Sequence, residues 1–162
     1  MTPPQVTLRD KAAELLTAGE VDLVIGYQPA GRPVASSPLL CQYPQQADAL
    51  IFDRTCEYNL VNFLHRHRDQ RVAVVVKGCD ETSVVGLLQE GQVLRDHLVL
   101  LGAPCTGTID RRRLAAAAGS ADLAAIEERD DTLTVTLRSG ERVDVPLAEA
   151  LHPMCATCNV RN

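Results

Sequence analysis

The sequence predicts an α/β fold with a mostly parallel sheet flanked by helices and an appended C-terminal β-hairpin. Between residues 71 and 118 the chain follows the order strand, turn, helix, strand, turn, helix, which is typical of a βαβ unit with parallel strands. Residues 131–145 instead alternate apolar and polar side chains around a turn, the pattern of a hairpin with one face in water. No repeat or long linker interrupts these patterns, so residues 1–162 are expected to form a single domain.

The N-terminal part is predicted to contain a helix, a strand and two shorter helices. The first helix begins at Thr7 and ends at Gly19, and its apolar residues fall on one face. The apolar run 21–27 predicts a buried strand, and a loop rich in proline and glycine follows it. Helices are then expected over 44–52 and 57–67.

The central part is predicted to carry the two parallel strands. The run 72–76 consists of valines and one alanine, which indicates a strand covered on both faces. A second buried strand is expected over 97–101. A helix follows each strand and is expected to begin at an N-cap aspartate, Asp80 for the helix 81–90 and Asp110 for the helix that ends at 118.

The C-terminal part ends in a pair of cysteines. After the hairpin, residues 146–151 are expected to form a last helical turn. The tail 153–162 then carries Cys155-Ala-Thr-Cys158.

The charge and the termini limit the possible partners and the compartment. A formal net charge of −5 argues against a nucleic-acid partner, and the three arginines at 111–113 are interpreted as a solvated face. No segment supplies the about 20 apolar residues of a membrane span, and residues 1–4 lack the pattern of a secretory signal. We therefore expect a cytoplasmic protein, in which the six cysteines are free thiols or ligands rather than disulfides.

Five of the six cysteines lie at predicted turns: Cys56, Cys79, Cys105, Cys155 and Cys158. Cys79 and Cys105 each follow one of the two parallel strands, so both are expected at the carboxyl edge of the sheet, where ligands bind in open α/β folds. Thiolates are the ligands of iron–sulfur clusters and of zinc. The sequence therefore predicts an inorganic site, with Cys41 as a structural or incidental residue.

Other interpretations of these thiols remain open. A cysteine in an apolar chain is often only a small core side chain. The Cys-x-x-Cys pair can be a redox dithiol, although such dithiols usually begin a helix after a strand. Zinc can use four of the thiols, but zinc sites usually pair two Cys-x-x-Cys motifs and this chain has one. A cubane cluster, whose ligands come from scattered turns, suits the spacing better.

The segments around these cysteines resemble a known family. Residues 72–80 and 99–107, together with Cys56-Glu-Tyr-Asn-Leu60 and the terminal Cys-x-x-Cys, are similar to the beta subunits of coenzyme F420-reducing hydrogenases and dehydrogenases. The likeness extends from about Leu15 to Cys158. It points in particular to a bacterial branch of iron–sulfur proteins linked to formate dehydrogenase or heterodisulfide reductase systems.

The resemblance implies cofactors and the residues that hold them. Relatives of this kind bind a [4Fe-4S] cluster, and the five turn cysteines match the family's cysteines, of which one cluster needs four. Many relatives also bind a flavin, and the flavin expected for this chain is FAD. It is expected near Lys77, Gly78, Asp80 and Gly107, with Lys77 facing a phosphate. In the alternative interpretation, Lys77 is a surface charge at the end of a strand.

The predicted function is that of an iron–sulfur electron-transfer subunit of a cytoplasmic oxidoreductase complex. Residues 1–162 lack the ferredoxin segment of longer relatives, so a partner is expected to continue the electron path. That partner would resemble a ferredoxin, a formate dehydrogenase or a heterodisulfide reductase. No catalytic side chain is assigned to a subunit of this kind. The alternatives are an interaction module, stabilised by zinc or free of metal, and a thiol redox enzyme.

Overall fold

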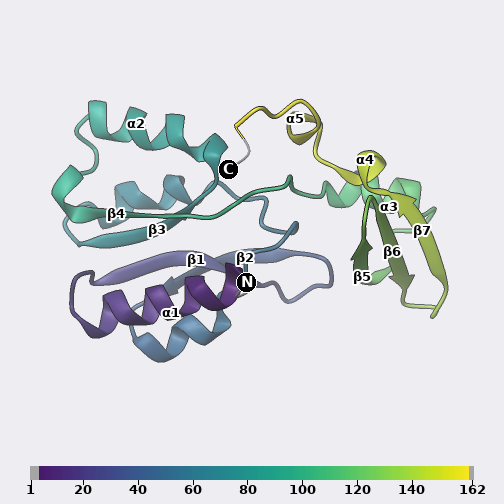
Figure 1. Ribbon diagram of the computed structural model, residues 1–162, viewed down its shortest axis with the longest axis horizontal. Helices are drawn as coiled ribbons and strands as arrows, with labels where there is room; N and C mark the ends of the chain where they lie inside the picture. Colours follow the sequence, from purple (N-terminus) through teal and green to yellow (C-terminus); the bar gives the residue numbers. More distant parts are fainter. Residues whose placement is uncertain (1–3, 161–162) are drawn as a thin grey trace.

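The computed structural model describes residues 4–160 and shows two lobes side by side (Figure 1). A larger lobe contains a four-stranded sheet with helices, and a smaller lobe contains a three-stranded sheet. Residues 1–3, which formed part of the argument about a secretory signal, and the last two residues of the tail lie outside the described range. Within this range no helix is long and apolar enough to cross a membrane.

The larger sheet has the strand order β2-β1-β3-β4. The strands span Leu23–Pro29 (β1), Ser36–Cys41 (β2), Val72–Val76 (β3) and Leu98–Gly102 (β4). β3 pairs in parallel with both β1 and β4, whereas β2 runs antiparallel to β1, so the predicted mostly parallel sheet is confirmed. The sequence did not predict β2, because Ser-Ser-Pro-Leu-Leu-Cys shows no alternation. Its proline is tolerated because β2 is an edge strand.

The helices of this lobe cover both faces of the sheet. α1 (Pro4–Thr17) and α2 (Glu81–Gln89) lie on opposite sides of it (Figure 1). The two segments predicted as helices after β2 form the 3-10 helices η1 (Pro44–Ala49) and η2 (Leu60–His67). Two one-turn 3-10 helices, η3 (Gly78–Asp80) and η4 (Arg95–His97), lead into α2 and β4.

Two apolar clusters lie on the two faces of the larger sheet. Ile25 of β1 belongs to the cluster that contains Leu64 of η2, and Val24 belongs to the cluster that contains Leu15 of α1. Successive residues of a strand point to opposite faces, which explains the division. The continuous apolar runs of β1 and β3 are therefore buried on both sides, as the sequence predicts.

The helix ends follow the predicted capping in two cases out of three. Gly19 adopts φ +64° after α1, and its N–H donates to the carbonyl oxygen of Leu16. The Asp110 side chain accepts hydrogen bonds from the first turn of α3 (Arg111–Ala117). The prediction for Asp80 is wrong, because its carboxylate caps no N–H of α2 and instead contacts Lys77.

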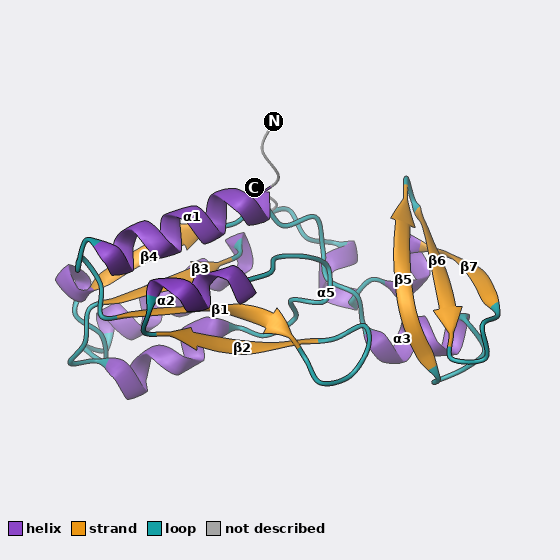
Figure 2. Cartoon of the chain, turned by 90° about the horizontal axis from the view of Figure 1, so that it is seen from below, coloured by secondary structure: helices purple, strands orange, loops and turns teal. Residues whose placement is uncertain are grey.

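The smaller lobe contains the predicted hairpin and one further strand. β6 (Thr132–Leu137) and β7 (Arg142–Pro146) form the hairpin, and β5 (Leu123–Arg129) pairs with the other edge of β6. The sequence does not predict β5, because its alanines and glutamates have low β-propensity. A separate apolar cluster joins this sheet to α3 and to α4 (Leu147–Ala150). Figure 2 shows the small sheet standing apart from the larger one.

Residues of the larger lobe hold the junction between the lobes. The Arg54 guanidinium forms two 2.7 Å hydrogen bonds with the Glu128 carboxylate of β5. It also donates to the carbonyl oxygens of Thr106 and Gly107. Ile109 bridges to Leu151, which brings the C-terminal tail back to the segment that joins the lobes. The prediction that residues 1–162 form one domain stays a prediction.

Candidate metal centre

Four thiols line one small pocket between the lobes: Cys79, Cys105, Cys155 and Cys158. Lys77, Gly78, Gly107 and Val160 complete the pocket, and its free volume is about 20 Å³. The thiols therefore gather around a narrow gap, although 26 residues separate the first two of them and 50 residues separate Cys105 from Cys155. This is the convergence on which the prediction of an inorganic site depends.

The parallel strands bring Cys79 and Cys105 together. β3 and β4 pair in register down to Val76 and Gly102, and each cysteine follows its strand by three residues. Both thiols thus lie at the carboxyl edge of the sheet, as predicted. Burial, together with the nearby Asp80 carboxylate, raises the pKa of Cys79.

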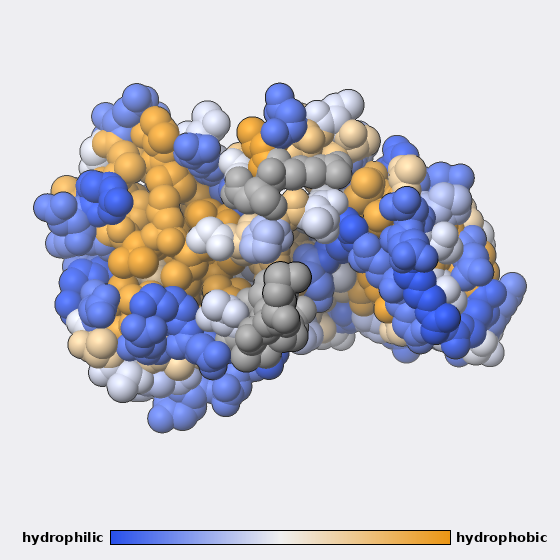
Figure 3. Space-filling view, in the orientation of Figure 1, coloured by the Kyte–Doolittle hydropathy of each residue, from blue (hydrophilic) through white to orange (hydrophobic). Residues whose placement is uncertain are grey.

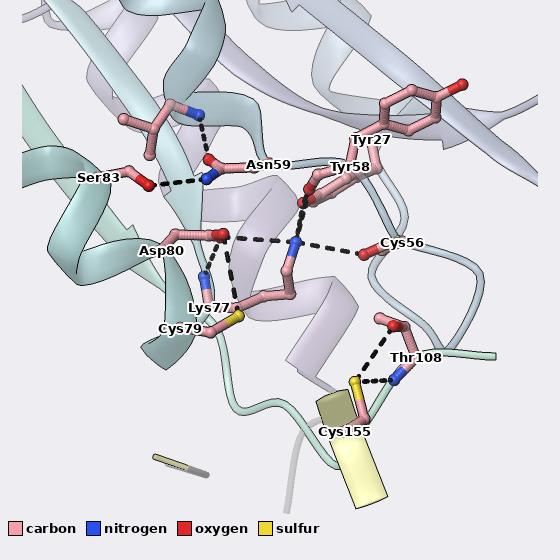
Figure 4. Close-up of polar contacts among 11 residues, drawn as sticks. Tyr27, Cys56, Tyr58, Asn59, Lys77, Cys79, Asp80, Ser83, Thr108 and Cys155 are labelled. Carbon is pink, nitrogen blue, oxygen red and sulfur yellow. Dashed lines mark hydrogen bonds and ion pairs between the residues drawn. The ribbon is translucent and has the colours of Figure 1, made fainter. Parts of the chain in front are cut away.

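The C-terminal tail brings the other two thiols. α5 (Pro153–Ala156) contains Cys155, and the N–H of His152 at its start donates to the carbonyl oxygen of Thr108. In return, the N–H of Thr108 donates to the Cys155 sulfur at 3.4 Å, and the Thr108 hydroxyl lies at the same distance (Figure 4). Sequence analysis missed Thr108, since a threonine outside any motif carries no signal of its own.

Gly107 allows this close approach. Its φ is +104°, and a Cβ there would lie 3.0 Å from a methyl carbon of Leu151 and 3.4 Å from the Cβ of Cys155. A side chain at 107 would therefore strain the backbone and push against the tail. The predicted role of Gly107 in flavin binding is not tested by these contacts, which show a packing role.

Cys56 and Cys41 lie outside the thiol pocket. Both are fully buried, and burial raises the pKa of Cys56 to about 12 and that of Cys41 to about 11. The Cys56 sulfur accepts a hydrogen bond from the N–H of Asp53 at 3.4 Å. Cys41 lies in the cluster on the α1 face of the sheet, which agrees with the structural role expected for it.

Lys77 is the centre of a buried polar network beside the thiols (Figure 4). Its ammonium donates to the Tyr27 hydroxyl and to the carbonyl oxygens of Tyr58 (2.6 Å) and Cys56 (3.3 Å). It also lies 3.5 Å from the Asp80 carboxylate. Lys77 is only 5% exposed, so its interpretation as a surface charge is wrong. The predicted contact with a flavin phosphate stays a prediction.

This network ties the cysteine turns to the rest of the lobe. The Asp80 carboxylate accepts a hydrogen bond from the N–H of Lys77 at 2.9 Å, so the pair encloses the turn that holds Cys79. Asn59 caps η2 through Val61 and donates to the Ser83 hydroxyl of α2. The turn after β3 is thereby fixed against both η2 and α2.

Among residues 4–160, no group of three or more His, Cys, Asp or Glu side chains is placed so that it could hold a metal ion, and the free volume between the four thiols is about 20 Å³. With Zn–S bonds of about 2.3 Å, a tetrahedral zinc site needs sulfurs about 4 Å apart. In a cubane cluster each thiolate binds a different iron, so the sulfurs stand farther apart. Four thiols at one pocket have the donor chemistry of such a cluster.

A larger cleft adjoins the thiols. It has a volume of about 460 Å³, within the range of small-molecule sites, and Tyr58, Asn59, Asp80, Met154 and Cys155 are among its lining residues. Of the residues predicted for flavin, Lys77 and Asp80 line this cleft, whereas Gly78 and Gly107 line the thiol pocket.

The comparisons with known proteins support the fold. No family model matches the sequence. The structure is similar to a chain of the F420-reducing [NiFe] hydrogenase complex from Methanosarcina barkeri, with a TM-score of 0.64 and 17% sequence identity. The match covers 96% of this chain and 57% of the hydrogenase chain, so this protein spans little more than half of the length of that chain. At this identity the likeness shows a shared fold.

Proposed function

We propose that this protein is an iron–sulfur electron-transfer subunit of a redox complex. The observation that carries the proposal is the meeting of Cys79, Cys105, Cys155 and Cys158 at one pocket. Cys56 is then the spare member of the five turn cysteines, because its buried sulfur faces Asp53 instead. A bound [4Fe-4S] cluster would accept and release single electrons.

The protein's own groups would tune such a centre. The N–H of Thr108 already donates to the Cys155 sulfur, and hydrogen bonds of this kind stabilise thiolate charge. Lys77 lines the same pocket, and its positive charge, which is paired with the Asp80 carboxylate, lowers the pKa of Cys79. Both effects favour the thiolate form that binds metal, whereas burial and the Asp80 carboxylate oppose it.

The proposal includes a flavin and a partner. FAD would occupy the cleft next to the thiols, which has room for part of a ligand of that size.

The larger lobe presents apolar surface (Figure 3), and its Val85, Leu94 and Leu100 are 44%, 54% and 43% exposed. Exposed apolar patches are typical of protein–protein contacts. The similar fold in a hydrogenase complex, and the resemblance to subunits linked to formate dehydrogenase or heterodisulfide reductase, support a redox partner.

Metal and sulfide analysis of the full chain, purified without oxygen, tests the proposal. We expect a brown protein with about four irons and four sulfides per chain. The second candidate is a zinc-stabilised module, and it would replace the proposal if the protein is colourless and holds one zinc per chain. A protein that binds neither metal after reconstitution with iron and sulfide would also contradict it.

A further inference from the structure

A second pocket gathers arginines from two distant parts of the chain. It has a volume of about 400 Å³ and is lined by Arg32, Arg111, Arg112, His152, Glu57 and Asp110. Arg32 comes from the loop between β1 and β2, and the other two arginines begin α3. Glu57 and His152 also line the cleft beside the thiols, so the two cavities are neighbours.

The three arginines at 111–113 differ in their surroundings. The Nε of Arg113 donates to the carbonyl oxygen of Glu149, and Arg113 does not line the pocket. Arg111 and Arg112 do line it, together with Arg32, 79 residues away. Arg112 and Arg113 are exposed and Arg111 is half-buried, so the interpretation of 111–113 as a solvated face holds for two of the three side chains.

Two of the three guanidinium groups at this pocket, those of Arg32 and Arg112, belong to exposed side chains. Among residues 4–160, neither Arg32 nor Arg112 forms an ion pair or a side-chain hydrogen bond. The Arg111 guanidinium instead donates to the carbonyl oxygen of Ala121 at 3.4 Å, and within the described residues its Nε is buried without a hydrogen-bond partner.

The two acidic residues of the pocket offset only part of this charge. The Asp110 carboxylate is occupied by the N–H groups of Arg112 and Arg113, since it caps α3. Glu57 lies on the wall shared with the thiol cleft. Three arginines against two carboxylates leave a positive balance here, in a protein whose formal net charge is −5.

We propose that this pocket binds the phosphate of a small molecule, with Arg32, Arg111 and Arg112 as its ligands. Guanidinium forks match phosphate oxygens in pairs, and three of them suit a doubly charged group better than a single carboxylate. This site does not depend on the proposed cluster, because none of the four pocket thiols lines it.

Titration calorimetry on the full chain tests this proposal, with inorganic pyrophosphate and ADP as probes at constant ionic strength. Both probes are expected to bind. ADP binding more tightly than pyrophosphate assigns the site to nucleotides, whereas equal affinities assign it to free phosphates. Malonate, a dicarboxylate, is the comparison anion, and equal affinity for malonate would overturn the assignment to phosphate.

Variants locate the binding. Arg32→Gln and Arg112→Gln are each expected to weaken pyrophosphate binding about tenfold. Glu57→Gln removes a negative charge that repels the anion, and it is expected to strengthen pyrophosphate binding about threefold. Arg138→Gln removes a positive charge, as the other two arginine variants do, but from the exposed hairpin turn. It should leave the affinity for pyrophosphate unchanged. The proposal is overturned if pyrophosphate does not bind, or if Arg138→Gln weakens binding as much as Arg32→Gln.

Discussion

At the scale of single residues, the cysteines differ in what surrounds their sulfur atoms. Cys79, Cys105, Cys155 and Cys158 share one pocket, whereas Cys41 and Cys56 are buried within the larger lobe. Burial disfavours the charged thiolate, and the raised pKa values of Cys41 and Cys56 reflect this. The proposed ligands are thus distinguished from Cys41 and Cys56 by their position in the fold.

Alanine variants separate the two groups of thiols. Cys79→Ala and Cys105→Ala are expected to lose most of the bound iron, and stability with it, because ligand binding is coupled to folding. Cys41→Ala and Cys56→Ala are the matched controls and should keep the full iron content, since alanine buries no new polar group. Iron analysis and the visible spectrum of anaerobic samples report the result. Iron loss in Cys56→Ala as complete as in Cys79→Ala would show that the assignment of the spare cysteine is wrong.

Lys77 and Asp80 form a buried pair whose members depend on each other. Lys77→Met leaves the Asp80 carboxylate, which is 2% exposed, without its cation, and should lower the free energy of unfolding by about 3 kcal/mol. The double variant Lys77→Met/Asp80→Asn removes both charges and should regain part of that loss. Urea unfolding of the metal-free protein measures both. A double variant as unstable as the sum of the two single ones would rule out the coupling.

At the scale of elements, the segment between β4 and α3 controls how the tail meets the sheet. Residues 103–110 accept hydrogen bonds from the Arg54 guanidinium on one side and from the backbone at the start of α5 on the other. Gly107 lies at the closest point, with its positive φ and with Leu151 and Cys155 beside it. The geometry of this one segment therefore decides whether the Cys-x-x-Cys pair reaches Cys79 and Cys105.

Gly107→Ala tests that control. The alanine must adopt φ +104° and displace Leu151, which should cost about 2 kcal/mol of unfolding free energy and reduce bound iron. Gly102→Ala, at the end of β4, is the control, because a Cβ there meets nothing within 4 Å and its φ is not positive. Thermal unfolding and iron content measure the effect. Equal behaviour of the two variants would contradict the role of Gly107.

At the scale of the whole molecule, two sheets with separate apolar clusters meet at a polar junction. The Arg54–Glu128 pair is the ion pair that joins the larger lobe to β5, with both guanidinium–carboxylate contacts at 2.7 Å. Hydrogen bonds from Arg54 hold the pKa of Glu128 below its ordinary value of 4.5. Partial exposure of this pair limits its contribution to about 1 kcal/mol.

Glu128→Gln should remove that contribution in a pH-dependent way. Since the pKa of Glu128 is lowered by folding, its stabilisation is complete above pH 4.5 and is lost as the pH falls through the lowered value. The difference in unfolding free energy between wild type and Glu128→Gln should therefore be about 1 kcal/mol near neutral pH and vanish in strong acid.

Glu127→Gln is the matched control for this junction. Glu127 pairs with Arg142 at 3.0 Å within the small sheet, and both side chains are about half exposed. Its replacement should change stability by less than about 0.5 kcal/mol. Urea unfolding between neutral pH and pH 3 compares the two variants. A difference for Glu128→Gln that is independent of pH would argue against the ion pair.

The sequence by itself determined the parts of the fold that depend on local patterns. The uninterrupted apolar runs of β1 and β3 specified buried strands, and the alternation after residue 131 specified the hairpin, because side-chain period and burial are properties of neighbouring residues. The run of β4 specified a strand but not its burial, since β4 lies at the sheet edge and its Leu100 is 43% exposed. The position of Cys79 and Cys105 at one sheet edge followed from the order of strand and helix. The weakly patterned strands β2 and β5 were not predictable, since they form by pairing with an edge that already exists.

Only the tertiary structure decided which side chains meet. It placed Cys155 and Cys158 beside Cys79 and Cys105 and left Cys56 in the core, because the return of the tail depends on the backbone at Gly107 and Thr108. It also buried Lys77, which the sequence left open between a surface charge and a ligand-binding group. Contacts across 50 or more residues depend on how lobes and loops close, and no local pattern in the chain encodes that closure.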